Sequence, residues 1–390
     1  MSADRKCVIC GATDRHRLSQ ETWEVAGLGP IDIGMVICTA CGFVYQHPVV
    51  PPEKMAACYT QMSNYTNPSR AGKPTDTKIA IVDSQTRFIR DRVGASGRAL
   101  QIGCSDGYTL SRFRAEGWQV KGVEPSGKAA QLAREMYGVD CAAEFFEAYT
   151  PQADERYDLI IMTHVLEHIY EPGQTLQKCH ALLNPGGHVY IEVPSLVEPE
   201  RWSSSYFSFE HVNYFAPVTM TNLLLRHGFT PVEPPVTVEY KANNPALRCL
   251  ARRADTVGHA VLTSDFTRAE SICRSFLERN RATWAAAEQR VRDGASDVNR
   301  LVIWGAGIHT SQLLCRTRLA EIRPIEFIAD MDPQKQGLRL GRYPIRSTNE
   351  IPFGDPTLAI VISSYASEKE ILKSIQARPN VQAKVIPLYT

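Results

Sequence analysis

The sequence predicts an α/β protein built in three parts. Two Cys-x-x-Cys pairs lie within the first 41 residues. Farther on, two separate apolar segments each run into a glycine turn, at Gly103–Gly107 and at Gly305–Gly307. Each turn opens a run of alternating candidate strands and helices, a pattern typical of a parallel sheet covered on both faces. We therefore expect a small cysteine module over 1–75, an α/β domain over 76–255 and a second α/β domain over 256–390.

Length and composition limit the class of protein. A chain of 390 residues is long enough for two or three domains, and its net charge of +1 argues against a general polyanion binder. The segment Met1–Lys6 is polar and charged, unlike a signal peptide, and no apolar run reaches membrane-spanning length. We expect a cytoplasmic protein with no membrane partner, in which the cysteines outside the two pairs are buried apolar side chains.

The first 255 residues divide into short elements. Ahead of the central domain we predict strands at Thr22–Val25 and Ile31–Ile37, a loop at Pro48–Pro52 and a loop or lid at Tyr59–Lys73. Apolar residues recur at helical or strand spacing farther along. They predict helices at Asp76–Val93, Thr109–Glu116, Lys128–Tyr137 and Pro172–Leu183, and strands at Ala99–Ile102, Val120–Val123, Leu159–Thr163 and His188–Val193.

A proline-rich and then basic stretch, Thr230–Arg253, is interpreted as a domain junction. One long helix is expected over Ser264–Asp293, capped by Ser264 or Asp265 and ended by Gly294. The last domain repeats the strand, turn and helix pattern. Its expected elements are the strands Leu301–Trp304, Ile325–Ile328 and Thr357–Ser363 and the helices Ile308–Arg318 and Ser367–Ala377.

Four cysteines have the spacing of a metal site. Cys7, Cys10, Cys38 and Cys41 form two knuckles whose thiolates can close a tetrahedral zinc site in a segment too short to bury its own core. Four thiolates fill such a site, so we predict structural zinc and no catalytic metal. A zinc ribbon can also bind nucleic acid, but acidic residues dilute the basic ones here, and we expect no nucleic-acid partner.

The first glycine turn predicts a nucleoside site. Gly103 and Gly107 let the backbone approach a ligand where side chains would block it. About twenty residues later the next strand ends at Glu124, a spacing that places a carboxylate at ribose hydroxyls.

Two later segments narrow the prediction to one nucleoside. The strand and polar lip Tyr157–His168 and the turn Leu182–Gly187 complete a pattern that resembles the class I S-adenosylmethionine (SAM)-dependent methyltransferases, which have a Rossmann-like fold. The resemblance implies SAM as cofactor. It places Gly103, Ser105 and Gly107 at methionine and ribose, Glu124 at the ribose hydroxyls, Pro125, Ser126, Glu144 and Phe145 around the adenine, Gln101 near the methionine amino group and His164 beneath the sulfonium.

Two of these positions carry a reservation. The family usually has an acidic residue where this chain has Gln101, and a glutamine accepts a hydrogen bond without supplying charge. His164 and His168 also suit simple packing and capping after the strand, and this alternative stays open beside cofactor contact.

An aromatic segment, Ser205–Phe215, contains the candidate general base. His211 follows Glu210, and histidine is the side chain whose pKa lies nearest neutrality. Glu210 is expected to tune the site or to bind an acceptor hydroxyl. A structural role for the histidine is the alternative.

The whole chain resembles the three-domain, zinc-containing sugar methyltransferases typified by the C-3′-methyltransferase of tetronitrose biosynthesis, which act on dTDP-linked keto-sugars. The resemblance implies catalytic roles for His211 and Glu210 and a tyrosine that Tyr59 or Tyr65 would supply; a second tyrosine of the family is replaced by Ser208. It also implies a small-molecule acceptor, a nucleotide sugar, methylated at carbon through an enolate or, alternatively, at a hydroxyl.

The second glycine turn would frame the acceptor site. Gly305 and Gly307 precede a helix whose N-terminus suits a diphosphate, and Asp330 ends the next strand. Taken alone, the turn indicates an NAD-dependent oxidoreductase or a purely structural lobe. The resemblance assigns Tyr214, Gly305, Gly307, His309, Ser363 and Tyr365 to substrate binding. It leaves open whether the protein is a monomer or a homodimer.

Overall fold

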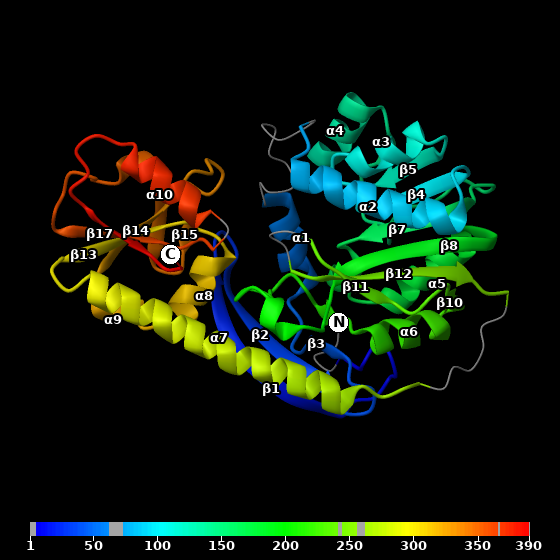
Figure 1. The fold of residues 1–390 in the computed structure, drawn as a ribbon, viewed down its shortest axis with the longest axis horizontal. Coiled ribbons are helices and arrows are strands. Elements are labelled where there is room, and N and C mark those ends of the chain that lie inside the picture. The colour runs from blue at the N-terminus through cyan, green and yellow to red at the C-terminus, as the bar shows by residue number, and fades with distance from the viewer. Residues whose placement is uncertain (1–4, 62–72, 241–243, 256–261, 366, 390) are drawn as a thin grey trace.

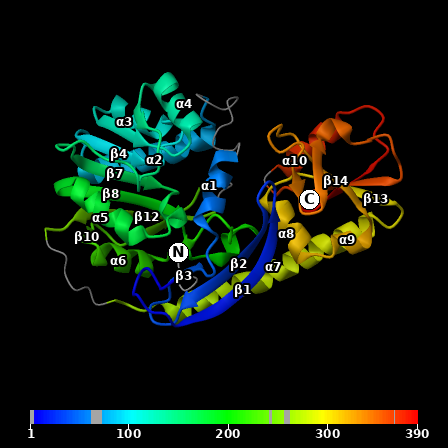
Figure 2. The ribbon, with the colours of Figure 1, turned by 180° about the vertical axis from the view of Figure 1, so that it is seen from behind.

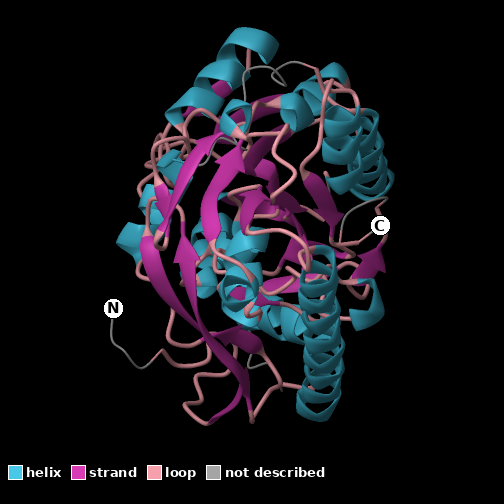
Figure 3. Cartoon of the chain, turned by 90° about the vertical axis from the view of Figure 1, so that its left-hand side faces the viewer, coloured by secondary structure: helices cyan, strands magenta, loops and turns pink. Residues whose placement is uncertain are grey.

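A computed structural model describes residues 5–61, 73–240, 244–255, 262–365 and 367–389. Over these ranges three sheets define the architecture, one for each expected part of the chain. The domain that follows residue 300 lies at one end of the molecule and the domain of the first glycine turn at the other (Figure 1). Seen from the side of the C-terminal domain, helices flank the strands (Figure 3).

The N-terminal sheet is longer than expected. Its strand order is β1-β2-β3-β9, with β1 at Arg15–Val25, β2 at Gly29–Cys38, β3 at Val44–Gln46 and β9 at Asn213–Tyr214. The prediction of short strands was wrong because only the most apolar stretch of each strand was recognised. The polar half, including Ser19, Gln20 and Glu21, pairs across the hairpin in antiparallel register, with one irregularity between Arg17 and Ser19.

The β1–β2 hairpin links the cysteine module to the C-terminal domain. Its base lies at Cys38, and at the other end Glu21 pairs with Arg316 at 2.9 Å. Helix α7, Phe266–Gly294, contacts β2 and takes the same course (Figures 1 and 2). It matches the predicted long helix: Asp265 occupies the cap position without a capping side-chain bond. The two elements act as parallel struts between the ends of the molecule.

Helix α1, Pro52–Gln61, replaces part of the predicted loop. Tyr59 therefore stands on a helix, and Tyr65 lies outside the described residues. Among the described helices, none combines the length and the apolar character needed to cross a membrane.

The central sheet has the order β10-β12-β8-β7-β4-β5-β6. The five strands β6, β5, β4, β7 and β8 are parallel to one another, and β12 is antiparallel to β8. The order reverses at β4, which has β5 on one side and β7 on the other, so ligands are expected at the carboxyl end of β4. The strands are β4 Arg98–Ile102, β5 Gln119–Val123, β6 Asp140–Ala142, β7 Tyr157–Thr163, β8 Leu183–Pro194, β10 Phe229–Pro231, β11 Val236–Val238 and β12 Ala246–Arg253.

Helices α2 to α5 of this domain agree closely with the prediction and α6 was not predicted, whereas the expected junction at Thr230–Arg253 was wrong. That stretch contains β12, a buried strand whose basic residue Arg248 is paired with the buried Glu192 at 3.1 Å. A strand that contains a charged residue is easily taken for a surface segment when the buried partner of that charge is unknown. The helices are α2 Asp76–Val93, α3 Tyr108–Ala115, α4 Gly127–Tyr137, α5 Pro172–Leu182 and α6 Pro217–Arg226.

The C-terminal sheet has the order β15-β16-β14-β13-β17-β18 and repeats the same principle. Strand β13 is parallel to both β14 and β17, so its carboxyl end is again a switch point. The elements are β13 Arg300–Trp304, α8 Ile308–Arg316, α9 Leu319–Ile322, β14 Ile325–Asp330, β15 Arg339–Leu340, β16 Tyr343–Ser347, β17 Leu358–Ile362, α10 Glu368–Gln376 and β18 Lys384–Pro387.

Candidate functional site

The loop after β4 has the backbone that its glycines permit. Gly103 and Gly107 have φ values of 70° and 82°, and Ser105 shares this region at 51°. A Cβ on Gly103 would lie 2.5 Å from a methyl carbon of Val165, and one on Gly107 would lie 2.9 Å from the Cβ of Ala133. Both glycines are therefore required by conformation and by space, and they hold the loop flat against the sheet edge.

Glu124 is fixed beside this loop. One carboxylate oxygen accepts from the backbone N–H of Ser105 and the other from that of Ser126, each at 2.9 Å. Burial raises the pKa of Glu124, and the two N–H donors oppose that rise. Each oxygen keeps a free lone pair, so the carboxylate can still accept two further donors. This donor requirement fits the adjacent hydroxyls of a ribose.

Gln101 carries an unsatisfied acceptor. The side chain is buried, its amide nitrogen lies 3.3 Å from the Thr163 hydroxyl, and its Oε1 has no hydrogen-bond partner among the described residues. A buried carbonyl oxygen without a donor is costly, typically about 1–3 kcal/mol. An ammonium group at this position would satisfy it. The glycine loop, Glu124 and Gln101 together therefore fit SAM.

The other predicted cofactor residues follow the neighbouring strand ends. Pro125 and Ser126 come directly after Glu124, and the Ser126 side chain caps α4. Glu144 and Phe145 follow β6, the edge strand next to β5, and Phe145 is 45% exposed. Their contacts with adenine stay predictions.

A replacement at Glu124 tests the cofactor assignment. Glu124→Gln keeps the shape but replaces one acceptor oxygen with a donor that faces a backbone N–H. We expect SAM to bind about 10- to 100-fold more weakly, as a lost charged hydrogen bond implies. Calorimetric titration with S-adenosylhomocysteine measures this. Glu135→Gln, on the exposed face of α4, is the control, and equal affinity of Glu124→Gln and wild type would contradict the assignment.

An acidic residue lies among three histidines after β7. His164 has φ 54° and its side chain is half exposed to the cleft, while Glu167, in the 3₁₀ helix Leu166–His168, is 1% exposed. The Glu167 carboxylate lies 3.3 Å from His164 and 3.7 Å from His168. Burial opposes ionisation of Glu167, but the three histidines outweigh it and lower its pKa to about 2. Glu167 thus stays negative and in turn raises the pKa of His164 against desolvation.

Glu210 and His211 approach the same carboxylate from another segment. The rings of His168 and His211 meet edge to face at 4.8 Å, and His168 Nδ1 is 3.0 Å from the Glu210 carbonyl oxygen. One oxygen of Glu167 and one nitrogen of each of these histidines lie within 4.8 Å of one another. Burial, followed by the charge of His168, lowers the pKa of His211 to about 3. His211 is therefore neutral at pH 7.

Glu167 was not predicted as a site residue, because His164 and His168 were considered separately. A carboxylate between two histidines in Thr163–His168 was the available signal. Tyr214, which was assigned to the acceptor, is buried with its ring 6.0 Å from that of His211, and its hydroxyl lies 3.0 Å from the backbone nitrogen of Ser208. It supports the Glu210–His211 segment from behind. Its contact with the acceptor stays a prediction.

A cleft of about 1430 Å³ separates the central and C-terminal domains. His164 and His211 line one side of it, and the C-terminal glycine turn lines the other. The structure thus brings five predicted substrate residues to the cleft that holds the histidines. These residues are Gly305, Gly307, His309, Ser363 and Tyr365.

The far side of the cleft repeats the chemistry of the cofactor loop. Asp330, at the end of β14, accepts from the Ala306 N–H at 2.7 Å, as Glu124 does from Ser105. His309 bonds Ser363 at 2.8 Å and Tyr389 at 2.5 Å, and burial, with a smaller effect of Arg316, lowers its pKa to about 4. The C-terminal glycine turn thus makes the same contact between a strand-end carboxylate and a backbone N–H as the first glycine turn.

Acid should destabilise the protein through His211 and His309, whose pKa values are lowered by burial. Each accepts a proton near pH 6.5 when unfolded but resists it when folded, so the unfolded state binds more protons. Stability is then expected to fall as pH drops from 6.5 toward 4, by up to about 1.4 kcal/mol per pH unit for each histidine. Thermal melts at pH 7 and pH 5 and matched ionic strength measure this. A shallower dependence is expected for His309→Gln, and an unchanged melting temperature at pH 5 would contradict the shifts.

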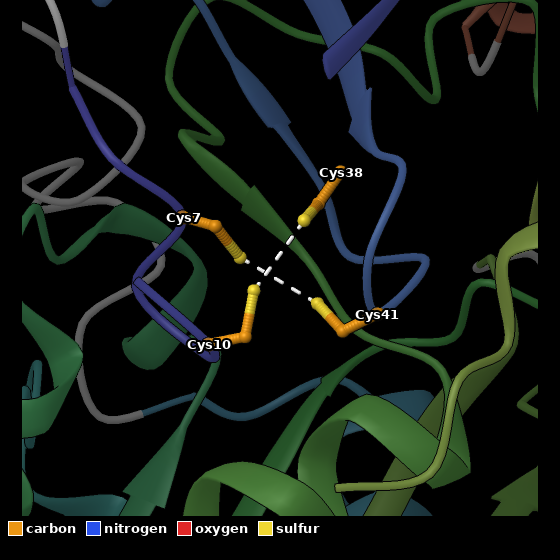
Figure 4. A group of neighbouring side chains, drawn as sticks. All are labelled: Cys7, Cys10, Cys38 and Cys41. Atoms are coloured by element: carbon orange, nitrogen blue, oxygen red, sulfur yellow. Dashed lines mark hydrogen bonds between the residues drawn. The ribbon is translucent and has the colours of Figure 1, made fainter. Parts of the chain in front are cut away.

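The four cysteines of the N-terminal module converge on one point (Figure 4). Cys7 and Cys41 Sγ are 3.6 Å apart, and Cys10 and Cys38 Sγ are 3.5 Å apart. Four thiolates on one zinc ion at about 2.3 Å stand roughly 3.8 Å from one another. The donor set and spacing fit a tetrahedral metal ion.

The fold and the site define the class of protein. Residues 79–233 match the family model described as a methyltransferase domain, and the chain is a SAM-dependent methyltransferase with a Rossmann-like fold. Over 369 residues it is 25% identical to the C-methyltransferase NovU of Streptomyces niveus, an alignment that covers 89% of this chain and 84% of NovU.

Other similarities cover less of the chain. The ubiquinone biosynthesis O-methyltransferase of Serratia proteamaculans is 32% identical over 111 residues, which span 27% of this chain and about half (46%) of that relative. The Burkholderia thailandensis 1,6-didemethyltoxoflavin-N1-methyltransferase structure is 21% identical with a TM-score of 0.42, covering 57% of this chain and 96% of that one. The structure of the N-methyltransferase NodS of Bradyrhizobium japonicum is 18% identical with a TM-score of 0.38, covering 49% of this chain and 99% of that one.

Proposed function

We propose that the protein transfers a methyl group from SAM to a carbon atom next to a carbonyl in a nucleotide-linked sugar. One observation carries the proposal: a single cleft joins His164 and His211 to a second nucleotide-type site at Gly305, Gly307 and Ser363. An acceptor with a reactive end and a nucleotide end fits such a cleft. The similarity to NovU, which is named a C-methyltransferase, supports a carbon acceptor.

His211 would act as the base. Its neutral imidazole removes the proton from the carbon next to the carbonyl, and the electron pair of the C–H bond forms an enolate on the acceptor. Burial also weakens His211 as a base. The ionised Glu167 opposes this only in part, because its negative charge favours the imidazolium as it forms. Bound SAM supplies an electrophilic methyl group, and the enolate carbon is the nucleophile that such a methyl group requires.

Glu210 has a different role. Burial raises its pKa, so this carboxyl is a better hydrogen-bond donor to the acceptor than an ordinary glutamate. Tyr59 or Tyr65 would supply the tyrosine that the resemblance implies for the acceptor site.

At the nucleotide end, backbone groups and acids would provide the contacts. The N-terminus of α8 follows Gly307 and presents N–H groups to a diphosphate, with Lys335 3.6 Å from Asp330 as a nearby cation. The hydroxyl of Ser363 and the exposed ring of Tyr365 lie beside this point. We also propose that Cys7, Cys10, Cys38 and Cys41 hold a structural zinc ion.

Labelled transfer decides the function. The protein is incubated with methyl-labelled SAM and a panel of nucleotide-linked keto-sugars, the corresponding hydroxy-sugars, and free sugars. The product is located by mass spectrometry and NMR. Label on carbon next to the carbonyl supports the proposal, label on oxygen replaces it with O-methylation, and transfer only to acceptors without a nucleotide overturns the role of the C-terminal site.

A further inference from the structure

The segment that carries Glu210 and His211, residues 203–212, has little structure of its own. Between Trp202 and β9 it forms neither a helix nor a strand, and most of its backbone carbonyls find no partner inside the segment. Buried carbonyls need donors, so the position of His211 depends on the groups that supply them.

Gln46, the last residue of β3, supplies two of these donors. Its side chain is fully buried, and its amide nitrogen donates to the carbonyl oxygens of Ser208 and Phe209, each at 2.9 Å. Its backbone N–H donates to the Val212 carbonyl at 3.0 Å. One residue of the cysteine module thus holds the chain on both sides of Glu210 and His211.

Gln312, on α8 of the C-terminal domain, holds the preceding residue. Its side chain is also fully buried; its amide nitrogen donates to the Phe207 carbonyl at 3.2 Å, and its Oε1 accepts from the Ser205 hydroxyl at 2.8 Å. Three successive carbonyls, of Phe207, Ser208 and Phe209, are therefore taken by two glutamines from two different domains.

We propose that Gln46 and Gln312 are positioning residues that form a clamp, defined by these two side chains, on the His211 segment. The inference rests on the proposed role of His211 in catalysis. Gln46 lies five residues after Cys41, on a strand paired with the one that ends at Cys38, so the cysteine module reaches the site through it. Gln312 lies one turn after His309 on α8, the helix that begins at the cleft, so the C-terminal domain contacts the same segment.

The test replaces each amide by a carboxylate, as Gln46→Glu and Gln312→Glu. The change keeps the shape but turns a donor into an acceptor that faces carbonyl oxygens. We expect kcat to fall about 10- to 100-fold, as a displacement of about 1 Å can cause, with KM for SAM and the affinity for S-adenosylhomocysteine within twofold of wild type. Hydrogen exchange measured by mass spectrometry should rise in peptides covering 205–214 and not in the central sheet.

The matched control is Asn222→Asp, which makes the same chemical change at another buried amide. The Asn222 side chain on α6 donates to the Thr263 carbonyl at 2.8 Å, away from the His211 segment. It should lower thermal stability yet keep kcat and the exchange of 205–214 within twofold. If Gln46→Glu does not fold, Gln46→Met removes the donors without adding charge.

The outcomes separate the two proposals. Unchanged kcat and unchanged exchange in both clamp variants overturn the clamp, even if His211 is essential. Raised exchange limited to 205–214 with normal S-adenosylhomocysteine affinity supports it, even if no sugar acceptor is methylated. A loss of kcat equal to that of Asn222→Asp, with exchange raised throughout the protein, overturns positioning in favour of general destabilisation.

Discussion

Replacing His211 by asparagine is expected to lower kcat by about 10²- to 10⁴-fold, the usual contribution of a general base. Asparagine keeps a polar group of similar size but cannot accept the proton from the acceptor carbon. Cofactor binding should be unaffected because the glycine loop follows β4 and Glu124 follows β5, whereas His211 belongs to the separate segment before β9. Steady-state methyl transfer to the acceptor found in the labelling panel measures kcat, and calorimetry measures the affinity for S-adenosylhomocysteine.

Two controls accompany this variant. His180→Asn changes a partly buried histidine on α5, outside the cleft, and should keep near-full activity. The pH profile is the second: with a pKa of about 3, His211 stays neutral from pH 5 to pH 8, so kcat should show no rising limb from this group. Near-full methyl transfer by His211→Asn would end the general-base assignment.

Loss of the metal ion should have the largest effect on stability. The base of the β1–β2 hairpin, the start of α7 and strand β3 all meet at the cysteine cluster; the Asp265 N–H, for example, donates to the Cys41 carbonyl at 3.1 Å. Structural zinc contributes on the order of 10 kcal/mol in small zinc modules. We expect about one zinc per chain in protein purified without chelator, and unfolding of the N-terminal sheet in Cys38→Ser.

Metal analysis and thermal melts measure both expectations. Cys315→Ser is the matched control, because this thiol is exposed on α8 and makes no part of the cluster; its melting temperature should equal that of wild type. Protein that contains no zinc and yet has wild-type stability would contradict the prediction of a structural zinc ion. Since Gln46 lies on β3, activity should fall together with the metal content.

The fold was largely predictable because local signals agreed with the tertiary structure. Strands β4, β5 and β7 are short apolar runs followed by a turn, and the helices between them have regular apolar spacing, so these elements agree with the prediction within a few residues. The short strand β6, Asp140–Ala142, was not predicted because it has no apolar run. The predictions for the β1–β2 hairpin and for β12 were wrong for the same reason. Polar and charged residues in them, such as Glu21 and Arg248, have partners more than fifty residues away in the chain.

The candidate site divides in the same way. The geometry of the first glycine loop was predictable because Gly103, Gly107 and Glu124 lie in one contiguous strand, turn, helix and strand unit. The surroundings of His211 were not, because their geometry depends on contacts from Glu167, Gln46 and Gln312, which no local spacing relates to one another.

By itself, the sequence determined the class of methyltransferase, the grouping of the four cysteines, and the glycine loop with its acidic partner Glu124. Each of these is encoded in residues close together in the chain, where backbone preference and spacing decide the outcome. The tertiary structure alone decided that the two α/β domains share one cleft, that the buried Glu167 lies among three histidines, and that Tyr214 is buried. These depend on the packing of distant segments, in which a buried donor or charge selects the partner that satisfies it.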